Sequence, residues 1–190
     1  TSPSTRAWVF QANPQYFNLA AALGTLTQIP FLINQSKNQV QKGDKVFFWE
    51  AGPNGGLVGT GTVLTEPKEM PDDDASRPYY VDPAKFQGSK TRSIVRVDQV
   101  LSSPVPRSVF LNHPILRDMT VLTVRAGTNF RLTPEQAEAL SELVASAAPS
   151  RYFRISGPRT PEDWALCLER GLLLLDAKAP SIHLARLASE

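Results

Sequence analysis

The chain has 190 residues, 42% of them hydrophobic, which is enough for one ordinary core and a small second unit. Its net charge of +2 does not by itself indicate nucleic-acid binding. Its single cysteine, Cys167, excludes an internal disulfide, and with two histidines it makes no convincing zinc site. No run approaches the ~18 apolar residues that span a bilayer and no secretory signal opens the sequence, so we expect a cytoplasmic protein.

The first part of the chain predicts a strand, a helix and a second strand. Residues 6–11 alternate well enough for a strand. Asn13 suits a helix N-cap and Pro14 the first helical position, so we expect a short apolar-faced helix that ends at Gly24. Residues 31–33 are expected to form the next strand.

Residues 42–64 form the stretch around which we expect the rest to be organised. Two β-type runs flank a Gly/Pro/Asn-rich loop, which predicts a hairpin. Successive strand residues face opposite sides, so Phe47 and Trp49 share one face and Phe48 lies on the other. One face must be core, and we expect the other to leave room for a flat ring beside glycines. The glycines concerned are Gly55, Gly56, Gly59 and Gly61.

The middle of the chain predicts a loop, a strand and a well-defined helix start. Residues 66–78 form a Pro-rich acidic loop, after which residues 79–81 are expected to re-enter the sheet. Residues 92–101 alternate most cleanly and predict a strand. Thr133 as N-cap, a proline at the first helical position and Gln136 at the third form a capping box, which opens a helix.

The sequence predicts two units of unequal size. Residues 6–146 form the larger one, residues 147–150 a linker, and residues 151–190 a short unit of strand, helix, strand and a further helical stretch. Because about forty residues rarely build an independent core, the short unit either packs on the first or begins a larger domain.

No reaction centre emerges from the motifs. Neither His113 nor His183 lies near a GxSxG elbow, and the Gly-Thr-Gly of residues 59–61 is not followed by the lysine of a phosphate loop. We therefore predict no catalytic residue, no metal and no cofactor.

Aromatic residues on or beside strands are the remaining signal. Core packing is the ordinary interpretation for Trp8, Phe47 and Phe48, whereas Trp49 and Tyr80 lie at strand ends beside Gly- or Pro-rich loops. Flat rings beside a slot would suit a nucleobase lifted out of its strand. Nearby amides and hydroxyls come from Gln11, Asn13, Asn34 and Thr128. Basic side chains that could hold phosphates are Lys37, Lys90, Arg92, Arg125 and Arg131.

Five short segments resemble the EVE domain family. They are WVFQANP at 8–14, KGDKVFFW at 42–49, GTGTV at 59–63, GTNF at 127–130 and LTPE at 132–135. The resemblance covers residues 6–144 and implies a PUA-like fold related to the YTH and ASCH domains. That fold is a small mixed β-barrel of five or six strands flanked by short helices, so the chain is predicted to be α+β with a short C-terminal βαβ-like appendage.

The resemblance also implies a site. Members of the superfamily bind modified nucleic acid with a flipped base in an aromatic-lined pocket. Carried over by position, the pocket residues are Gln11, Asn13, Phe31, Ile33, Trp49, Tyr79 and Tyr80. Asn129 joins the five basic residues above as a contact to the nucleic-acid backbone.

Three functions follow as hypotheses. The first is recognition, by base flipping, of double-stranded DNA that contains 5-methylcytosine or 5-hydroxymethylcytosine. The domain would then be the recognition module of a modification-dependent restriction system, with a nuclease or GTPase effector fused beyond Glu190. The fragment itself would be a monomeric binding module. The second is an RNA module that reads a modified base such as N6-methyladenine. The third is a small enzyme that acts on modified nucleosides. The sequence offers no credible catalytic base or nucleophile for it.

Overall fold

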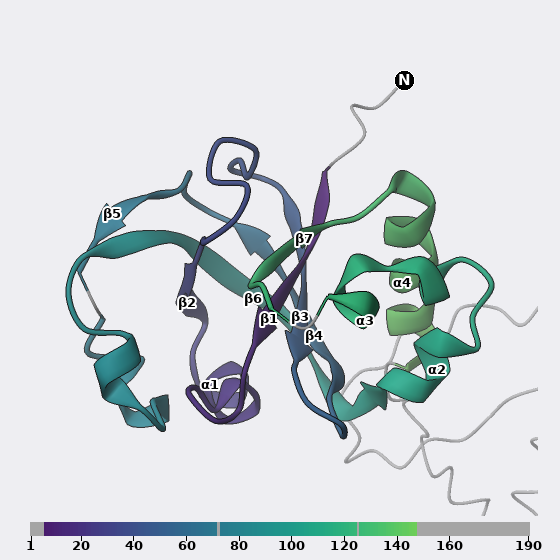
Figure 1. Ribbon diagram of the computed structural model, residues 1–190, viewed down its shortest axis with the longest axis horizontal. Helices are drawn as coiled ribbons and strands as arrows, with labels where there is room; N and C mark the ends of the chain where they lie inside the picture. Colours follow the sequence, from purple (N-terminus) through teal and green to yellow (C-terminus); the bar gives the residue numbers. More distant parts are fainter. Residues whose placement is uncertain (1–5, 72, 125, 148–190) are drawn as a thin grey trace, which may run out of the picture. The chain divides into compact units, whose positions relative to one another are not determined.

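The computed structural model describes residues 6–71, 73–124 and 126–147, which form one curled sheet with helices packed on both faces (Figure 1). The strands are β1 (Ala7–Ala12), β2 (Gln28–Leu32), β3 (Lys45–Glu50), β4 (Gly56–Val63), β5 (Lys68–Met70), β6 (Lys90–Pro106) and β7 (Asn129–Arg131). The α-helices are α1 (Leu19–Thr25), α2 (Arg107–Leu111), α3 (Thr120–Thr123) and α4 (Pro134–Ala147), and the 3-10 turns are η1 (Arg77–Tyr79), η2 (Pro83–Lys85) and η3 (Leu116–Asp118). Residues 148–190, with most of the predicted linker and the C-terminal unit, lie outside the described residues.

Within the described residues the seven strands form one mixed sheet in the order β2-β6-β4-β3-β1-β7, with β5 paired to β6. Every neighbouring pair is antiparallel except β1 and β3, which run parallel with Trp8 opposite Val46. β6 pairs with three strands, and two register shifts against β4 bend it. The α+β class with a small mixed β-barrel flanked by short helices is confirmed, although its sheet has seven strands rather than five or six. No helix in the described part of the chain is long and apolar enough to cross a membrane.

Both faces of β3 are buried, because each lies in a different hydrophobic core. Phe47 and Trp49 point to the outer face, which α2, α3 and α4 cover. Phe48 points into the barrel interior with Trp8 and residues of α1. The predicted alternation and the core packing of Trp8, Phe47 and Phe48 are confirmed. The expectation that one face stays open for a ring is wrong, because helices from a distant part of the sequence cover it.

The space beside the hairpin glycines is filled by the protein itself. A Cβ added at Gly61 would lie 2.4 Å from the carbonyl oxygen of Arg96 and 2.8 Å from the ring of Phe48. A Cβ at Gly59 would lie 2.6 Å from the carbonyl oxygen of Gln99. The glycines therefore allow β6 and a core ring to approach the backbone of β4, and the predicted slot for a ligand is not there.

The Asn-Pro pair after β1 begins a turn and not a helix. The Oδ1 of Asn13 accepts from the backbone N–H of Gln15 at 2.9 Å, which is an Asx turn. Helix α1 starts later, where the side chain of Asn18 accepts from the backbone N–H of Ala21 at 3.2 Å. The predicted N-cap at Asn13 is thus wrong, and the turn leaves Phe17 free to form a β-bridge with Tyr80.

The capping box at the start of α4 is confirmed. The Oγ1 of Thr133 accepts from the backbone N–H of Gln136 at 3.2 Å, and the Oε1 of Gln136 accepts from the backbone N–H of Thr133 at 3.1 Å. The first turn of the helix also binds the carboxylate of Glu135. Hydrogen bonds from its own backbone N–H and from the Thr133 side chain lower the pKa of that carboxyl.

The two ends of the sheet are joined by the side chain of Asn129 on β7. Its Oδ1 accepts from the backbone N–H of Asn34 at 3.0 Å, and its Nδ2 donates to the carbonyl oxygen of Leu32 at 3.1 Å. The Oε1 of Gln35 extends this connection, because it accepts from the backbone N–H of Thr128 at 2.9 Å. Asn129 is buried, so its carboxamide replaces the N–H and C=O of a neighbouring strand and closes the barrel.

We expect Asn129→Ala to lower the free energy of unfolding by roughly 1–3 kcal/mol, because it leaves two backbone groups at the barrel seam without partners. Asn112→Ala is the control, since its exposed amide bonds only the carbonyl of Ser108 and should change stability by less than about 0.5 kcal/mol. Urea denaturation measures both. Equal, small losses in the two variants would contradict a closing role for Asn129.

Trp49→Ala should lower the free energy of unfolding by about 3–5 kcal/mol, because it opens a void in the outer core. The ring of Trp49 packs edge-on against Phe110 with centroids 4.9 Å apart. Trp49→Phe, which keeps an aromatic ring there, should lose much less in the same denaturation experiment. A Trp49→Ala variant as stable as Trp49→Phe would refute the assignment to the core.

Candidate functional site

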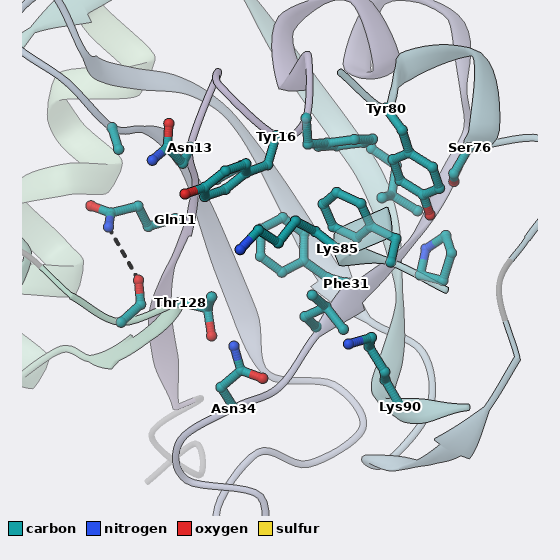
Figure 2. Close-up of a pocket in the computed structure, with 18 of the residues that line it drawn as sticks. Gln11, Asn13, Tyr16, Phe31, Asn34, Ser76, Tyr80, Lys85, Lys90 and Thr128 are labelled. Atoms are coloured by element: carbon teal, nitrogen blue, oxygen red, sulfur yellow. Dashed lines mark hydrogen bonds between the residues drawn. The ribbon is translucent and has the colours of Figure 1, made fainter. Parts of the chain in front are cut away.

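A cavity of about 460 Å³ lies where β1 and β2 end, and Figure 2 shows the side chains that surround it. This volume falls within the roughly 300–1,000 Å³ of small-molecule sites. The walls come from the end of β1 and the turn after it, from β2, from the segment between β5 and β6, and from the residues before β7. Its described lining includes Gln11, Asn13, Tyr16, Phe17, Phe31, Asn34, Tyr80, Lys85, Phe86, Lys90 and Thr128.

Aromatic rings form one wall and the floor of the cavity. Tyr80 and Phe86 stack in parallel, with centroids 4.2 Å apart and planes 5° from each other, and Phe17 packs against both. Phe31 on β2 is buried against Phe10, with centroids 5.2 Å apart, so it continues the hydrophobic interior up to the cavity. Rings already held by neighbouring rings present fixed flat surfaces to a ligand.

The loop that carries Tyr80 and Phe86 is fixed by Arg92. This side chain on β6 is fully buried, and its guanidinium donates to the carbonyl oxygens of Met70 and Phe86, each at 2.7 Å. Arg92 therefore anchors the two ends of the segment between β5 and β6. The prediction that it contacts phosphates is wrong, because a fully buried guanidinium inside the protein cannot reach a nucleic-acid backbone.

Amide and backbone polar groups form the opposite wall. The Nε2 of Gln11 donates to the carbonyl oxygen of Gly127 at 3.1 Å, and the backbone N–H of Gln11 donates to the carbonyl oxygen of Thr128 at 2.8 Å. Asn34 is exposed, and its side chain lies below Thr128 in the view of Figure 2. A ring that entered between the two walls would meet hydrogen-bonding groups on one side and aromatic faces on the other.

The charge of the cavity is positive. Lys85 and Lys90 line it, and no aspartate or glutamate occurs among its described lining residues. The ammonium of Lys85 lies 5.2 Å from the centroid of the Tyr16 ring. The two lysines therefore favour an anionic ligand in the cavity, and no carboxylate of the described lining would repel it.

The structure brings together four of the seven predicted pocket residues, Gln11, Asn13, Phe31 and Tyr80. The other three lie elsewhere. Trp49 is 2% exposed in the outer core because it points away from the barrel interior. Ile33 is fully buried in the interior core, and Tyr79 packs beside that core, with its carbonyl oxygen accepting from the backbone N–H of Asn18 at 2.8 Å.

The residues predicted to contact the nucleic-acid backbone also lie partly at the cavity and partly elsewhere. Lys90 lines the cavity, whereas Lys37 is exposed beside it, with its ammonium donating to the Oγ1 of Thr91 at 2.8 Å. Arg131 is exposed on β7 away from the described lining, and Asn129 is the buried seam residue, which corrects its assignment to phosphate contact. Arg125 lies outside the described residues.

Sequence reasoning missed Tyr16 and Lys85 as parts of the site. Tyr16 falls within the helix predicted between Asn13 and Gly24, but it lies in the turn that begins at Asn13, and the Asx turn was the signal that could have shown this. Lys85 follows Pro83 in a loop without periodicity, and no local pattern marks it. The segment 79–81 contributes through one isolated bridge, Phe17 with Tyr80, and not through a sheet strand.

Comparison with known proteins supports the fold. A solved structure of a hypothetical protein from Leishmania major is 15% identical, with a TM-score of 0.55 over 75% of this chain and 96% of that one. Human THYN1 protein in complex with 5-methylcytosine-containing DNA is 16% identical, with a TM-score of 0.52 over 73% of this chain and 97% of that one. A protein from Agrobacterium tumefaciens is 19% identical, with a TM-score of 0.51 over 73% and 92%. At such identities the likeness shows a shared fold.

The family assignment comes from the sequence as a whole. No curated protein matches the chain significantly. A model of the EVE domain family, however, matches residues 6–143, which is most of the chain and nearly all of the described barrel. The chain therefore belongs to the EVE domain family.

Proposed function

We propose that this EVE domain binds DNA that contains 5-methylcytosine or 5-hydroxymethylcytosine, with the modified base flipped into the cavity at the end of the barrel. The observation that carries the proposal is the cavity itself, with aromatic faces on one wall, amides on the other and no described carboxylate. The human THYN1 structure of the same fold is a complex with 5-methylcytosine-containing DNA. That complex makes modified cytosine the first ligand to test.

Stacking in the cavity can offset the cost of extruding a base. Flipping costs a few kcal/mol, and each base–aromatic contact returns about 1–3 kcal/mol. Tyr16, Phe31 and Tyr80 reach the cavity from three separate segments, and two of these rings are supported by further rings behind them. A pyrimidine with a small substituent fits such a site because the aromatic and aliphatic surface of β2 accepts a methyl group without leaving polar atoms unpaired.

The amide wall supplies the polarity that cytosine needs. Gln11 and Asn34 each carry a carbonyl oxygen that can accept from an exocyclic amine and an NH₂ that can donate to a ring nitrogen or carbonyl. Gln11 is held by its hydrogen bond to Gly127, which leaves its Oε1 available as an acceptor. Binding energy would then depend on the base edge as well as on stacking.

Phosphates would be held at the cavity rim. Lys90 lines the opening and Lys37 lies close by on the segment after β2, where its ammonium bonds Thr91. Contacts of this kind carry no sequence information and make affinity fall with salt. They position the duplex so that a base can enter the cavity.

We also infer that binding serves restriction, as the first of the three hypotheses drawn from the sequence states. In this proposal the domain reads the modification and a nuclease or GTPase elsewhere in the same protein acts on the DNA. A reading frame that joins this domain to such an effector is the expected observation, and a free-standing gene would argue for a different use of the same site.

Titration of duplexes that differ in one cytosine, unmodified, 5-methylated or 5-hydroxymethylated, tests the proposal by fluorescence anisotropy. We expect tighter binding of a modified duplex, and Tyr80→Ala should weaken that binding about 10- to 100-fold while affecting the unmodified duplex less. Val81→Ala is the control, because Val81 is an exposed neighbour outside the described lining. Equal affinities for all three duplexes would refute selectivity.

The choice of polymer is tested by competition. Matched DNA and RNA oligonucleotides carrying 5-methylcytosine, and RNA carrying N6-methyladenine, should compete against labelled modified duplex DNA. We expect the DNA to compete best. Stronger competition by the N6-methyladenine RNA would replace the DNA proposal with an RNA one.

A further inference from the structure

Two loops that frame the cavity meet through the side chains of Lys85 and Tyr16. Tyr16 belongs to the turn after β1, where its backbone N–H donates to the carbonyl oxygen of Asn13 at 2.9 Å. Lys85 ends η2 on the opposite loop, and its side chain reaches across the cavity toward the tyrosine (Figure 2). Its ammonium lies over the Tyr16 ring, 5.2 Å from the centroid.

This contact is weak, and both of its residues line the cavity. A cation over an exposed aromatic ring contributes about 0.5–1 kcal/mol, and Tyr16 is 36% exposed. No described aspartate or glutamate forms an ion pair with Lys85. The ammonium therefore covers a ring face that could stack on a base, and little free energy holds it there.

We propose that Lys85 exchanges partners when a base enters: it leaves the face of Tyr16 and binds the phosphate of the flipped nucleotide. The inference rests on the proposed function, because it needs a base in the cavity. The base takes the place of the ammonium against the tyrosine ring. The sugar tethers the base to its phosphate, so that phosphate stays at the opening within the sweep of the long lysine side chain.

The exchange favours the bound state because the new contact is the stronger one. A hydrogen bond between an ammonium and a phosphate is charge-assisted, whereas the cation over the ring is not. A duplex whose bases stay stacked brings no phosphate to this point. Lys85 thus grips the backbone only after a base is captured, which makes it a specificity-determining residue and distinguishes it from Lys90 and Lys37 at the rim.

Salt dependence separates this role from ordinary phosphate binding. Each neutralised phosphate contributes about 0.9 to the slope of log affinity against log salt concentration. We expect Lys85→Gln to reduce that slope by about one for the modified duplex and to leave it unchanged for the unmodified duplex. Lys85→Arg should restore the wild-type slope.

Lys42→Gln is the matched control, because Lys42 is exposed just before β3, at the other end of that strand from the cavity residue Ala51. It should not reduce the slope selectively for the modified duplex. If Lys85→Gln reduces both slopes equally, or neither, the exchange is refuted while the proposed function stands. If wild-type protein binds both duplexes alike, both proposals fall.

The starting state can be observed without DNA by NMR. The ring current of Tyr16 should shift the terminal methylene resonance of Lys85, and Tyr16→Leu should abolish that shift. Adding the modified duplex to wild-type protein should also abolish it, and adding the unmodified duplex should not. A Lys85 resonance that keeps its shifted position in the modified complex would overturn the proposal.

Discussion

The carboxamide of Asn129 closes the barrel, and the cavity at the end of the barrel depends on that closure. Leu32 and Asn34 lie at the end of β2 and Asn129 begins β7, so the two outermost strands meet through a side chain instead of a strand ladder. Thr128, beside this seam, lines the cavity together with Asn34. A residue that looks suited to phosphate contact is instead the reason that two walls of the cavity stand opposite each other.

In the closed barrel most side chains of the central strands are used for packing, so few of them are available to line a site. The aromatic residues of β3 fill the two cores, and the glycines of β4 let β6 and Phe48 approach. Loops therefore provide much of the aromatic surface, since Tyr16 and Tyr80 come from two of them and Phe31 from the end strand β2. Arg92 fixes one loop by its carbonyl contacts, so an otherwise irregular segment can hold stacked rings in place. Binding residues in proteins commonly lie on loops that a rigid scaffold positions.

Part of the site was predictable because it follows strand ends. Gln11 and Phe31 end or lie near the end of their strands, and both line the cavity. Trp49 also lies near a strand end, but its alternation places it on the outer face, where Phe110 meets it. Period-two alternation tells which residues share a face and not which face is covered. Lys85 escaped prediction because its contact is with Tyr16, in another loop, and no local pattern marks that pairing.

The sequence by itself determined the features set by near neighbours, such as the strand at β3, the alternation of its aromatic residues and the capping box at Thr133, whose two partners are three positions apart. Tertiary structure decided the closed barrel, the covered face and the cavity. The hydrogen bond that joins Asn34 to Asn129 connects residues 95 positions apart, and the bond from Arg92 to Met70 connects residues 22 apart. Such contacts depend on how strands pair across the whole sheet, and that pairing is set by burial of two cores together, which no local pattern encodes.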